Sequence, residues 1–190
     1  MNTGAALVSG VDLQSALRQP LAGPWGIVDL SLNGTWQQHN SATPYRSAAS
    51  YDCAGLFGNT CLNGSVIPRW RHNLRVTWGL PAARTKLSAQ WRFIGHTGFD
   101  NNSAQALLQN KEEGSYDPVL THIPDYSYLD LAVIWEATRH VQLRLGVNNV
   151  LDKDPPVLPE EVSMQAGEIN TFPVYDVLGR TFFLGLRATL

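Results

Sequence analysis

The feature that most constrains this chain is the alternation of large apolar residues with polar or small residues along several segments. A period of two residues is typical of β-strands that have one apolar and one polar face. The alternation predicts seven strands, at Gly10–Arg18, Gly26–Gln38, Arg69–Gly79, Thr85–Gly95, Ser127–Trp135, Val141–Asn149 and Val177–Leu190. The 16 Gly and 11 Pro among 190 residues argue against a helical bundle. The predicted class is therefore all-β.

The connections between these strands alternate in length. Three are short, and the other three, residues 39–68, 99–126 and 150–176, are long. An antiparallel meander that crosses a membrane has this asymmetry, because the turns on one side stay tight while the loops on the other side are free to lengthen. A soluble β-sandwich would show the same alternation within its strands, so periodicity alone leaves that class open. The connection lengths favour a transmembrane β-barrel with three long extracellular loops.

Strand length and tryptophan positions agree with a barrel. A strand tilted by about 45° crosses the hydrocarbon in roughly 9 to 11 residues. Trp78 and Trp135 lie at the short-turn ends of their strands, and Trp36 and Trp70 lie at the long-loop ends. Two such levels are typical of the aromatic girdles of outer-membrane barrels, although tryptophans also occur at strand ends in other β proteins. No apolar run approaches the roughly 20 residues that a spanning helix needs.

The alternation assigns a face to each side chain. If the apolar side contacts lipid, then Leu30, Val76, Leu131, Leu145 and Leu184 face lipid. The basic residues between them would face the lumen: Arg75, Lys86, Arg92, Arg144 and Arg187. A basic lumen wall could guide an anion inward. It could equally form ion pairs with acidic groups of a plug inside the barrel.

Two cysteines lie close together in a loop. Cys53 and Cys61 belong to YDCAGLFGNTC, a Gly- and Asn-rich segment of the kind that disulfides close in oxidising compartments. We predict a disulfide between them, with two unrelated thiols as the alternative. Two cysteines without a second pair or a neighbouring histidine make only half of a zinc site. No metal site is therefore predicted.

Several function classes find no support in the sequence. A net charge of -2 and a pI near 6.2 give no basic footprint for nucleic acid. There is no G-x-S-x-G nucleophile motif, no P-loop and no G-x-G-x-x-G motif, so we expect neither an enzyme nor a cofactor. The five histidines are scattered and are expected at the surface or rim: His39, His72, His96, His122 and His140.

The carboxyl-terminal residues carry a family resemblance. The stretch LRLGVNNVLDKDPP, followed by a loop and then by YDVLGRTFFLGLRATL, resembles the last two strands of a TonB-dependent outer-membrane receptor. The preceding PDYSYLDLAVIWEATRHVQ resembles the strand and periplasmic turn before them. The resemblance is specific over Ile123–Leu190 and looser over the first 122 residues. One departure is Leu190, because the family more often ends in an aromatic residue.

The resemblance implies a location in the bacterial outer membrane and the uptake of a scarce nutrient such as a ferric siderophore, a vitamin or a glycan. The implied partners are outer-membrane lipid, the rest of the barrel and its plug, the TonB system, the barrel-assembly machinery and a small nutrient ligand. The terminal strand would close the barrel and be read during assembly, through Tyr175, Gly179, Arg180, Phe183 and Leu190. The ligand-contacting residues are unknown.

The predicted strands are too few for a whole receptor. Receptors of this kind enclose a plug with about 22 strands, so we expect residues 1–190 to be the carboxyl-terminal part of such a barrel, without plug domain, TonB box or signal peptide. A small barrel of eight strands is the alternative. A passive porin and a soluble β-sandwich binding module remain as other function classes.

Overall fold

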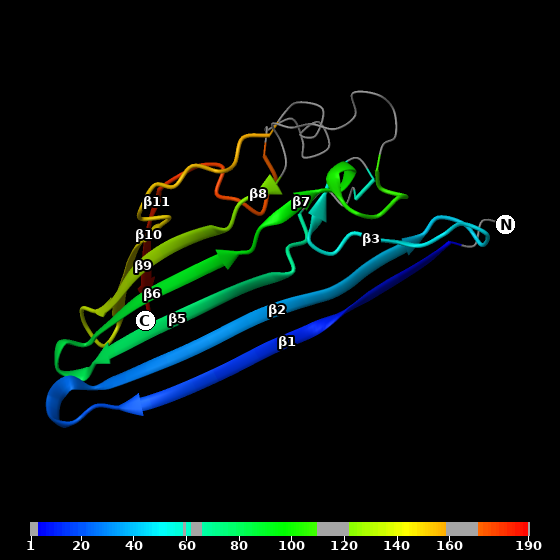
Figure 1. Ribbon diagram of the computed structural model, residues 1–190. Coiled ribbons are helices and arrows are strands. Elements are labelled where there is room, and N and C mark those ends of the chain that lie inside the picture. Colours follow the sequence, from blue (N-terminus) through cyan, green and yellow to red (C-terminus); the bar gives the residue numbers. More distant parts are fainter. Residues whose placement is uncertain (1–3, 59, 62–65, 110–121, 159–170, 190) are drawn as a thin grey trace.

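The computed structural model describes residues 4–58, 60–61, 66–109, 122–158 and 171–189. Seven strands form one antiparallel main sheet in the order β1-β2-β5-β6-β9-β10-β11. Their bounds are β1 (Ala5–Pro20), β2 (Ile27–Thr43), β5 (Trp70–Leu80), β6 (Thr85–Ile94), β9 (Tyr126–Glu136), β10 (Val141–Asn148) and β11 (Thr181–Ala188). In the described residues β1 does not pair with β11, so the sheet is open and curved (Figure 1). The prediction of an incomplete antiparallel barrel of seven main strands is confirmed.

The strand ends differ from the prediction in two places. The pairing of β1 with β2 continues past Gly10, to Ala5, because a register shift between Ser9 and Gly10 lets the ladder resume after a bulge. The last strand begins at Thr181 instead of Val177, because the chain turns just before it. In that turn Gly179 has a φ of 65° and donates its N–H to the Asp176 carbonyl over 3.2 Å. Leu190 lies outside the described residues.

The register gives the main sheet one apolar and one polar face. Leu30 lies opposite Val76, Ala89 lies between Val76 and Leu131, and Leu131 lies opposite Val147, all on the apolar face. On the other side Ser31, Arg75, Gln90 and Asp130 follow one another across neighbouring strands and define the polar face. Leu145 and Leu184 on the apolar face are 49% and 73% exposed. The main sheet therefore has no buried core on its apolar side within the described residues.

Tight turns join the strands at one end of the sheet. The turns η1 (Gly23–Trp25) and η2 (Pro81–Ala83) are short 3-10 turns, and Trp78 Nε1 donates to the Trp25 carbonyl over 2.7 Å. At Gly26, with a φ of 79°, a Cβ atom would lie 1.9 Å from the Gly79 carbonyl oxygen, so only glycine fits there. A further 3-10 turn, η3 (Asp100–Asn102), lies in the second long connection at the opposite end. No helix of the described residues could cross a membrane.

The buried core lies among the long connections at the other end of the sheet (Figure 1). Four short strands occur there: β3 (Tyr51–Asp52) pairs with β2, while β4 (Leu56–Phe57), β7 (Thr97–Phe99) and β8 (His122–Ile123) form a second sheet. The sequence did not predict them, because two or three residues show no period. The core contains residues from all three long connections and from the strand ends: Phe57, Val66, Ile94, Phe99, Ile123, Tyr126, Tyr128, Leu158, Phe172 and Tyr175.

Candidate functional site

The candidate site is the part of the polar face next to the loop core. Two concavities lie there, of 340 Å³ and 460 Å³, and Arg92 lines both of them. The first is bordered by polar side chains of β1, β2 and β5, such as Thr35, Arg71 and Asn73. The last long connection contributes Val174 to the first concavity and Asp176–Gly179 to the second. We call residues 171–180 the strap, because they border both hollows of the polar face.

Arg92 is held between two carboxylates. Its Nε donates to Asp130 Oδ2 over 2.7 Å, and its Nη1 donates to Asp176 Oδ1 over 2.8 Å. The guanidinium also lies 4.8 Å from the centre of the Tyr128 ring. The three charged side chains are only 24%, 16% and 21% exposed, in the order Arg92, Asp130, Asp176. Partly buried ion pairs of this geometry are screened by salt much less than surface pairs.

The strap is fixed to the sheet by more than this ion pair. The backbone N–H of Asp176 donates to Tyr128 Oη over 3.2 Å. Tyr175, 2% exposed, packs edge-on against Tyr126 with ring centres 4.9 Å apart. Burial raises the pKa of the Tyr175 hydroxyl. Tyr128 and Tyr175 therefore anchor the strap in addition to the ion pair.

The segment NNVLDKD builds the turn that begins this connection. Asn149 has a φ of 51°, donates its backbone N–H to Asp130 Oδ1 over 2.9 Å, and exchanges two side-chain hydrogen bonds with the backbone of Lys153. Asp152, with a φ of 54°, accepts the N–H of Arg180 over 2.8 Å. This segment, which carries part of the family resemblance, thus ties the start of the last connection to β9 and joins the two ends of that connection to each other.

The structure places the predicted basic residues on one face but does not gather them. Register puts Arg75, Lys86, Arg92, Arg144 and Arg187 together on the polar face. Of these five residues, only Arg92 lines the concavities of the candidate site. Arg75 donates to Gln90, and Arg144 lies over the Phe183 ring at 5.0 Å. Lys86 lines a separate hollow of 530 Å³ beside the tight turns.

Two features of the polar face were not anticipated. Arg71, which lines the first concavity, follows the same two-residue alternation as Asn73 and Arg75 and could have been found from it. The partners of Arg92 were expected in a ligand or a plug, yet the structure supplies Asp130 and Asp176 from this chain. The pairing of Arg92 with Asp176 could not be predicted from a local pattern, because the two residues are 84 positions apart.

The residues assigned to the terminal strand divide into two groups. Tyr175, Gly179 and Arg180 precede β11 and belong to the strap, so their assignment to that strand was wrong. Phe183 does lie in β11, where its ring covers Gly146: a Cβ atom there would be 2.1 Å from the ring. A role of these residues in barrel closure or assembly stays a prediction.

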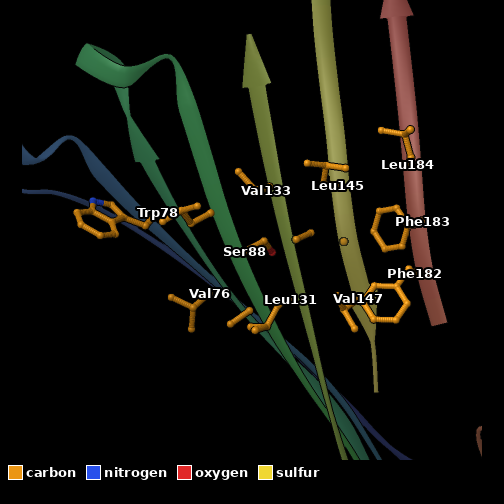
Figure 2. A pocket seen from close by; sticks show the side chains of 14 residues that line it. Val76, Trp78, Ser88, Leu131, Val133, Leu145, Val147, Phe182, Phe183 and Leu184 are labelled. Atoms are coloured by element: carbon orange, nitrogen blue, oxygen red, sulfur yellow. The ribbon is translucent and has the colours of Figure 1, made fainter. Parts of the chain in front are cut away.

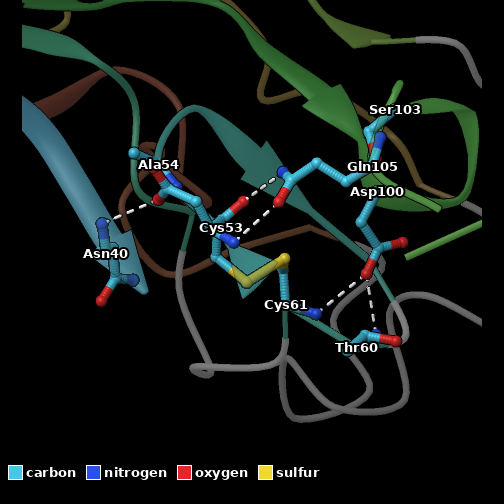
Figure 3. Close-up of a disulfide and its surroundings, with 9 residues drawn as sticks. Asn40, Cys53, Ala54, Thr60, Cys61, Asp100, Ser103 and Gln105 are labelled. Atoms are coloured by element: carbon cyan, nitrogen blue, oxygen red, sulfur yellow. Dashed lines mark hydrogen bonds between the residues drawn. A yellow bond between two sulfur atoms is a disulfide. The ribbon is translucent and has the colours of Figure 1, made fainter. Parts of the chain in front are cut away.

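The predicted disulfide is present in the loop core (Figure 3). Cys53 and Cys61 are bonded, with their Cα atoms 5.4 Å apart. Asp100, a fully buried residue of the second long connection, accepts the backbone N–H groups of Thr60 and Cys61 over 2.7 Å and 2.8 Å. The first two long connections are therefore joined at the disulfide ring.

The histidines occupy different environments. His39 and His96 pair with Asp52 and Asp125 near the loops. His72 lies on the apolar face, where Trp70 Nε1 donates to its Nδ1 over 2.9 Å and the Phe93 ring stacks on it at 5.2 Å. Within the described part of the chain, no three His, Cys, Asp or Glu side chains lie close enough to hold a metal ion.

Another hollow lies on the apolar face and differs in chemistry from the candidate site. It measures 740 Å³ and spans β5 to β11, between Trp78 on one side and Phe182 and Leu184 on the other (Figure 2). Its lining is almost entirely hydrocarbon, with Leu131 and Leu145 among the residues at its centre. Such a surface suits acyl chains and, apart from Ser88, offers a polar ligand little to bond with.

Comparison with known proteins identifies the family. A family model described as TonB dependent receptor-like, beta-barrel, matches residues 1–150. The chain belongs to this family. The match spans β1 to β10 and includes only residues 123–150 of the stretch that carries the motif resemblance. Members of the family are receptors and transporters, and the chain is accordingly not an enzyme.

Solved structures of the ferric enterobactin receptor PfeA from Pseudomonas aeruginosa have a similar fold. One mutant of that receptor gives a TM-score of 0.59 at 19% identity, over 97% of this chain and 22% of that chain. PfeA in complex with BCV-L6 gives 0.55 at 20% identity, over 96% and 22%. The chain thus spans about a fifth of the length of these TonB-dependent receptors. No curated protein sequence matches it.

Proposed function

We propose that residues 1–190 are the carboxyl-terminal part of the barrel of an outer-membrane receptor that takes up a small nutrient. The observation that carries this proposal is the main sheet, which exposes a continuous apolar face on one side and a polar face beneath packed loops on the other. Hydrocarbon is the solvent in which the apolar face is stable. The polar face would then line the lumen.

The open edges of the sheet support a larger barrel. Unpaired backbone groups at a sheet edge cost several kcal/mol each in hydrocarbon. β1 is 16 residues long and has one neighbour, β2, among the described residues. The rest of the barrel would pair with β1 and β11 and enclose a plug. The barrel-assembly machinery would insert the whole into the membrane.

The nutrient belongs to the classes that such receptors import, a ferric siderophore, a vitamin or a glycan. Enterobactin is the ligand in one of the similar PfeA structures. That likeness is below 25% identity and concerns the fold, so it does not select among these cargoes. Energy for import would come from the TonB system, acting on the part of the receptor that contains the plug.

A passive porin is the alternative function, and energy dependence separates the two. The complete receptor should be expressed in cells with and without a working TonB system, and uptake of candidate nutrients should be measured as radiolabel accumulated. We expect uptake in cells with a working TonB system and no uptake in cells that lack it. Equal uptake in both strains would establish a passive channel. Recovery of the protein in the soluble fraction would exclude both functions.

A further inference from the structure

The positive charge of Arg92 is already paired with two carboxylates of the same chain. The Arg92 guanidinium lies between the two concavities of the polar face and donates to both Asp130 and Asp176. One positive charge and two negative charges give this cluster a net charge of -1. An anion that approached within about 8 to 10 Å would meet a negative field from the cluster. Arg92 therefore does not attract anions while Asp176 is in place.

A free anion would compete poorly with Asp176. The carboxylate is tethered beside Arg92 by the strap, which is held by the Tyr128 hydrogen bond and by the burial of Tyr175. A tethered partner acts at an effective concentration on the order of millimolar. A scarce nutrient is far more dilute, so its carboxylate or phosphate groups would seldom replace Asp176.

We propose that Asp176 is a specificity-determining residue that masks Arg92 from anionic cargo, so that the 460 Å³ concavity beside the strap accepts neutral or cationic polar cargo. The proposal rests on the proposed function, since it requires cargo to pass along the polar face. The lining supports it, because Gln90, Asn148 and Thr181 offer uncharged donors and acceptors in the same concavity as Arg92. Such groups suit the hydroxyl and amide groups of an uncharged ligand.

Chemical modification of arginine tests the masking directly. The complete receptor in detergent is treated with phenylglyoxal, and modification of each arginine is followed by peptide mass spectrometry. Arg187, exposed on the same face, serves as the internal reference. In the native receptor we expect Arg92 to react much more slowly than Arg187. In Asp176→Asn its rate should rise toward that of Arg187, and citrate, but not maltitol, should slow it again.

Two variants separate charge from folding. Asp176→Glu keeps the negative charge on the strap and should leave Arg92 protected. Asp29→Asn removes the partner of Arg18, a pair with both side chains well exposed, and should change nothing at Arg92. Rapid modification of Arg92 in the native receptor would show that it is not masked and would overturn the proposal. Failure of citrate to protect Arg92 in Asp176→Asn would overturn it as well.

Uptake measurements connect the masking to specificity. In cells that express the complete receptor, Asp176→Asn should raise uptake of an anionic substrate relative to a neutral one, while Asp176→Glu keeps the native ratio. An unchanged ratio in Asp176→Asn, with uptake intact and Arg92 reactive, would reject the role in specificity but leave the proposed function standing. If uptake by the native receptor did not depend on TonB, the proposed function itself would be rejected instead.

Discussion

The side chain of Gln105 pairs with the backbone of Asp52 as a neighbouring strand would. The Asp52 N–H donates to Gln105 Oε1 over 2.8 Å, and Gln105 Nε2 donates to the Asp52 carbonyl over 2.6 Å. These residues belong to different long connections, 53 positions apart. Together with the bonds from Asp100 to Thr60 and Cys61, this pairing makes the first two loops one packed unit.

Replacing Gln105 should therefore loosen the loops locally. Gln105→Leu keeps the side-chain size but leaves the Asp52 N–H and carbonyl without their partner, which costs about 1 to 3 kcal/mol for a partly buried group. Hydrogen exchange at the Asp52 amide should accelerate accordingly. Gln109→Leu is the matched control, because the Gln109 side chain is exposed and bonds locally, to the Ser103 carbonyl. Equal protection in both variants would contradict the strand-like role of Gln105.

Acid should weaken the same region. Burial raises the pKa of the Asp52 carboxyl, but hydrogen bonds from the backbone of Asn40 and Ala54 and from His39 bring it below its usual 3.8. A lowered folded pKa stabilises the loops above pH 3.8, and this stabilisation is lost as the pH falls through the folded value. Protection of the Asn40 amide should decline in that range. In Asp52→Asn the decline should be absent, and its persistence would point to another group.

The disulfide should contribute to loop order. A ring that closes eight positions of sequence is worth about 2 to 3 kcal/mol in the loop-entropy model. The double change Cys53→Ser and Cys61→Ser should raise proteolysis within residues 44–69 while leaving β9 and β10 protected. Mass spectrometry of the non-reduced native chain should find no alkylatable thiol. Two alkylated cysteines in exported protein would refute the bridge.

Local pattern was sufficient to predict the strands of the main sheet. An alternation of nine or more residues is long enough to show its period, so β5, β6, β9 and β10 were placed within one residue of their observed ends. The disulfide was also predictable, because Cys53 and Cys61 are close in sequence. The loop core was not, since Phe57, Phe99 and Phe172 come from three separate connections.

Contacts between distant residues set the rest of the candidate site. Asp176 lies 84 positions from Arg92, and no local period relates the two. The turn before β11 contains Gly179 with its positive φ, and the last strand starts four residues later than predicted. Tertiary contacts of this kind decide which basic residue on the polar face forms an ion pair. The alternation in the sequence shows only that these residues share a face.

The assignment of the two faces can be tested by charge. Leu145→Arg places a cation on the face that we propose contacts lipid and should cost about 2 to 4 kcal/mol of folding stability near the bilayer midplane. Leu145 and Arg144 are neighbours on β10 with opposite directions, so Arg144→Gln is the matched control and should be mild. The free energy of unfolding of both variants can be measured by urea titration of protein refolded into lipid vesicles. A larger loss in Arg144→Gln would reverse the faces.

The final prediction concerns residues 1–190 expressed alone in water. Seven strands leave the edges of β1 and β11 open in the described residues, and a meander with an odd number of strands could close only by pairing its first and last strands in parallel. The apolar face would stay exposed, including Leu145 and Leu184, and would far exceed the few hundred Å² that a soluble monomer tolerates.

The expressed chain should therefore aggregate without detergent. In size-exclusion chromatography we expect the protein in the void volume. On addition of detergent, the circular dichroism spectrum of a β protein should be recovered. Changing Leu145 and Leu184 to Ser should raise the soluble fraction, whereas Arg75→Ser on the polar face should not. A monodisperse monomer that melts cooperatively in buffer would mean that the apolar face is buried in a core, and the membrane assignment would fail.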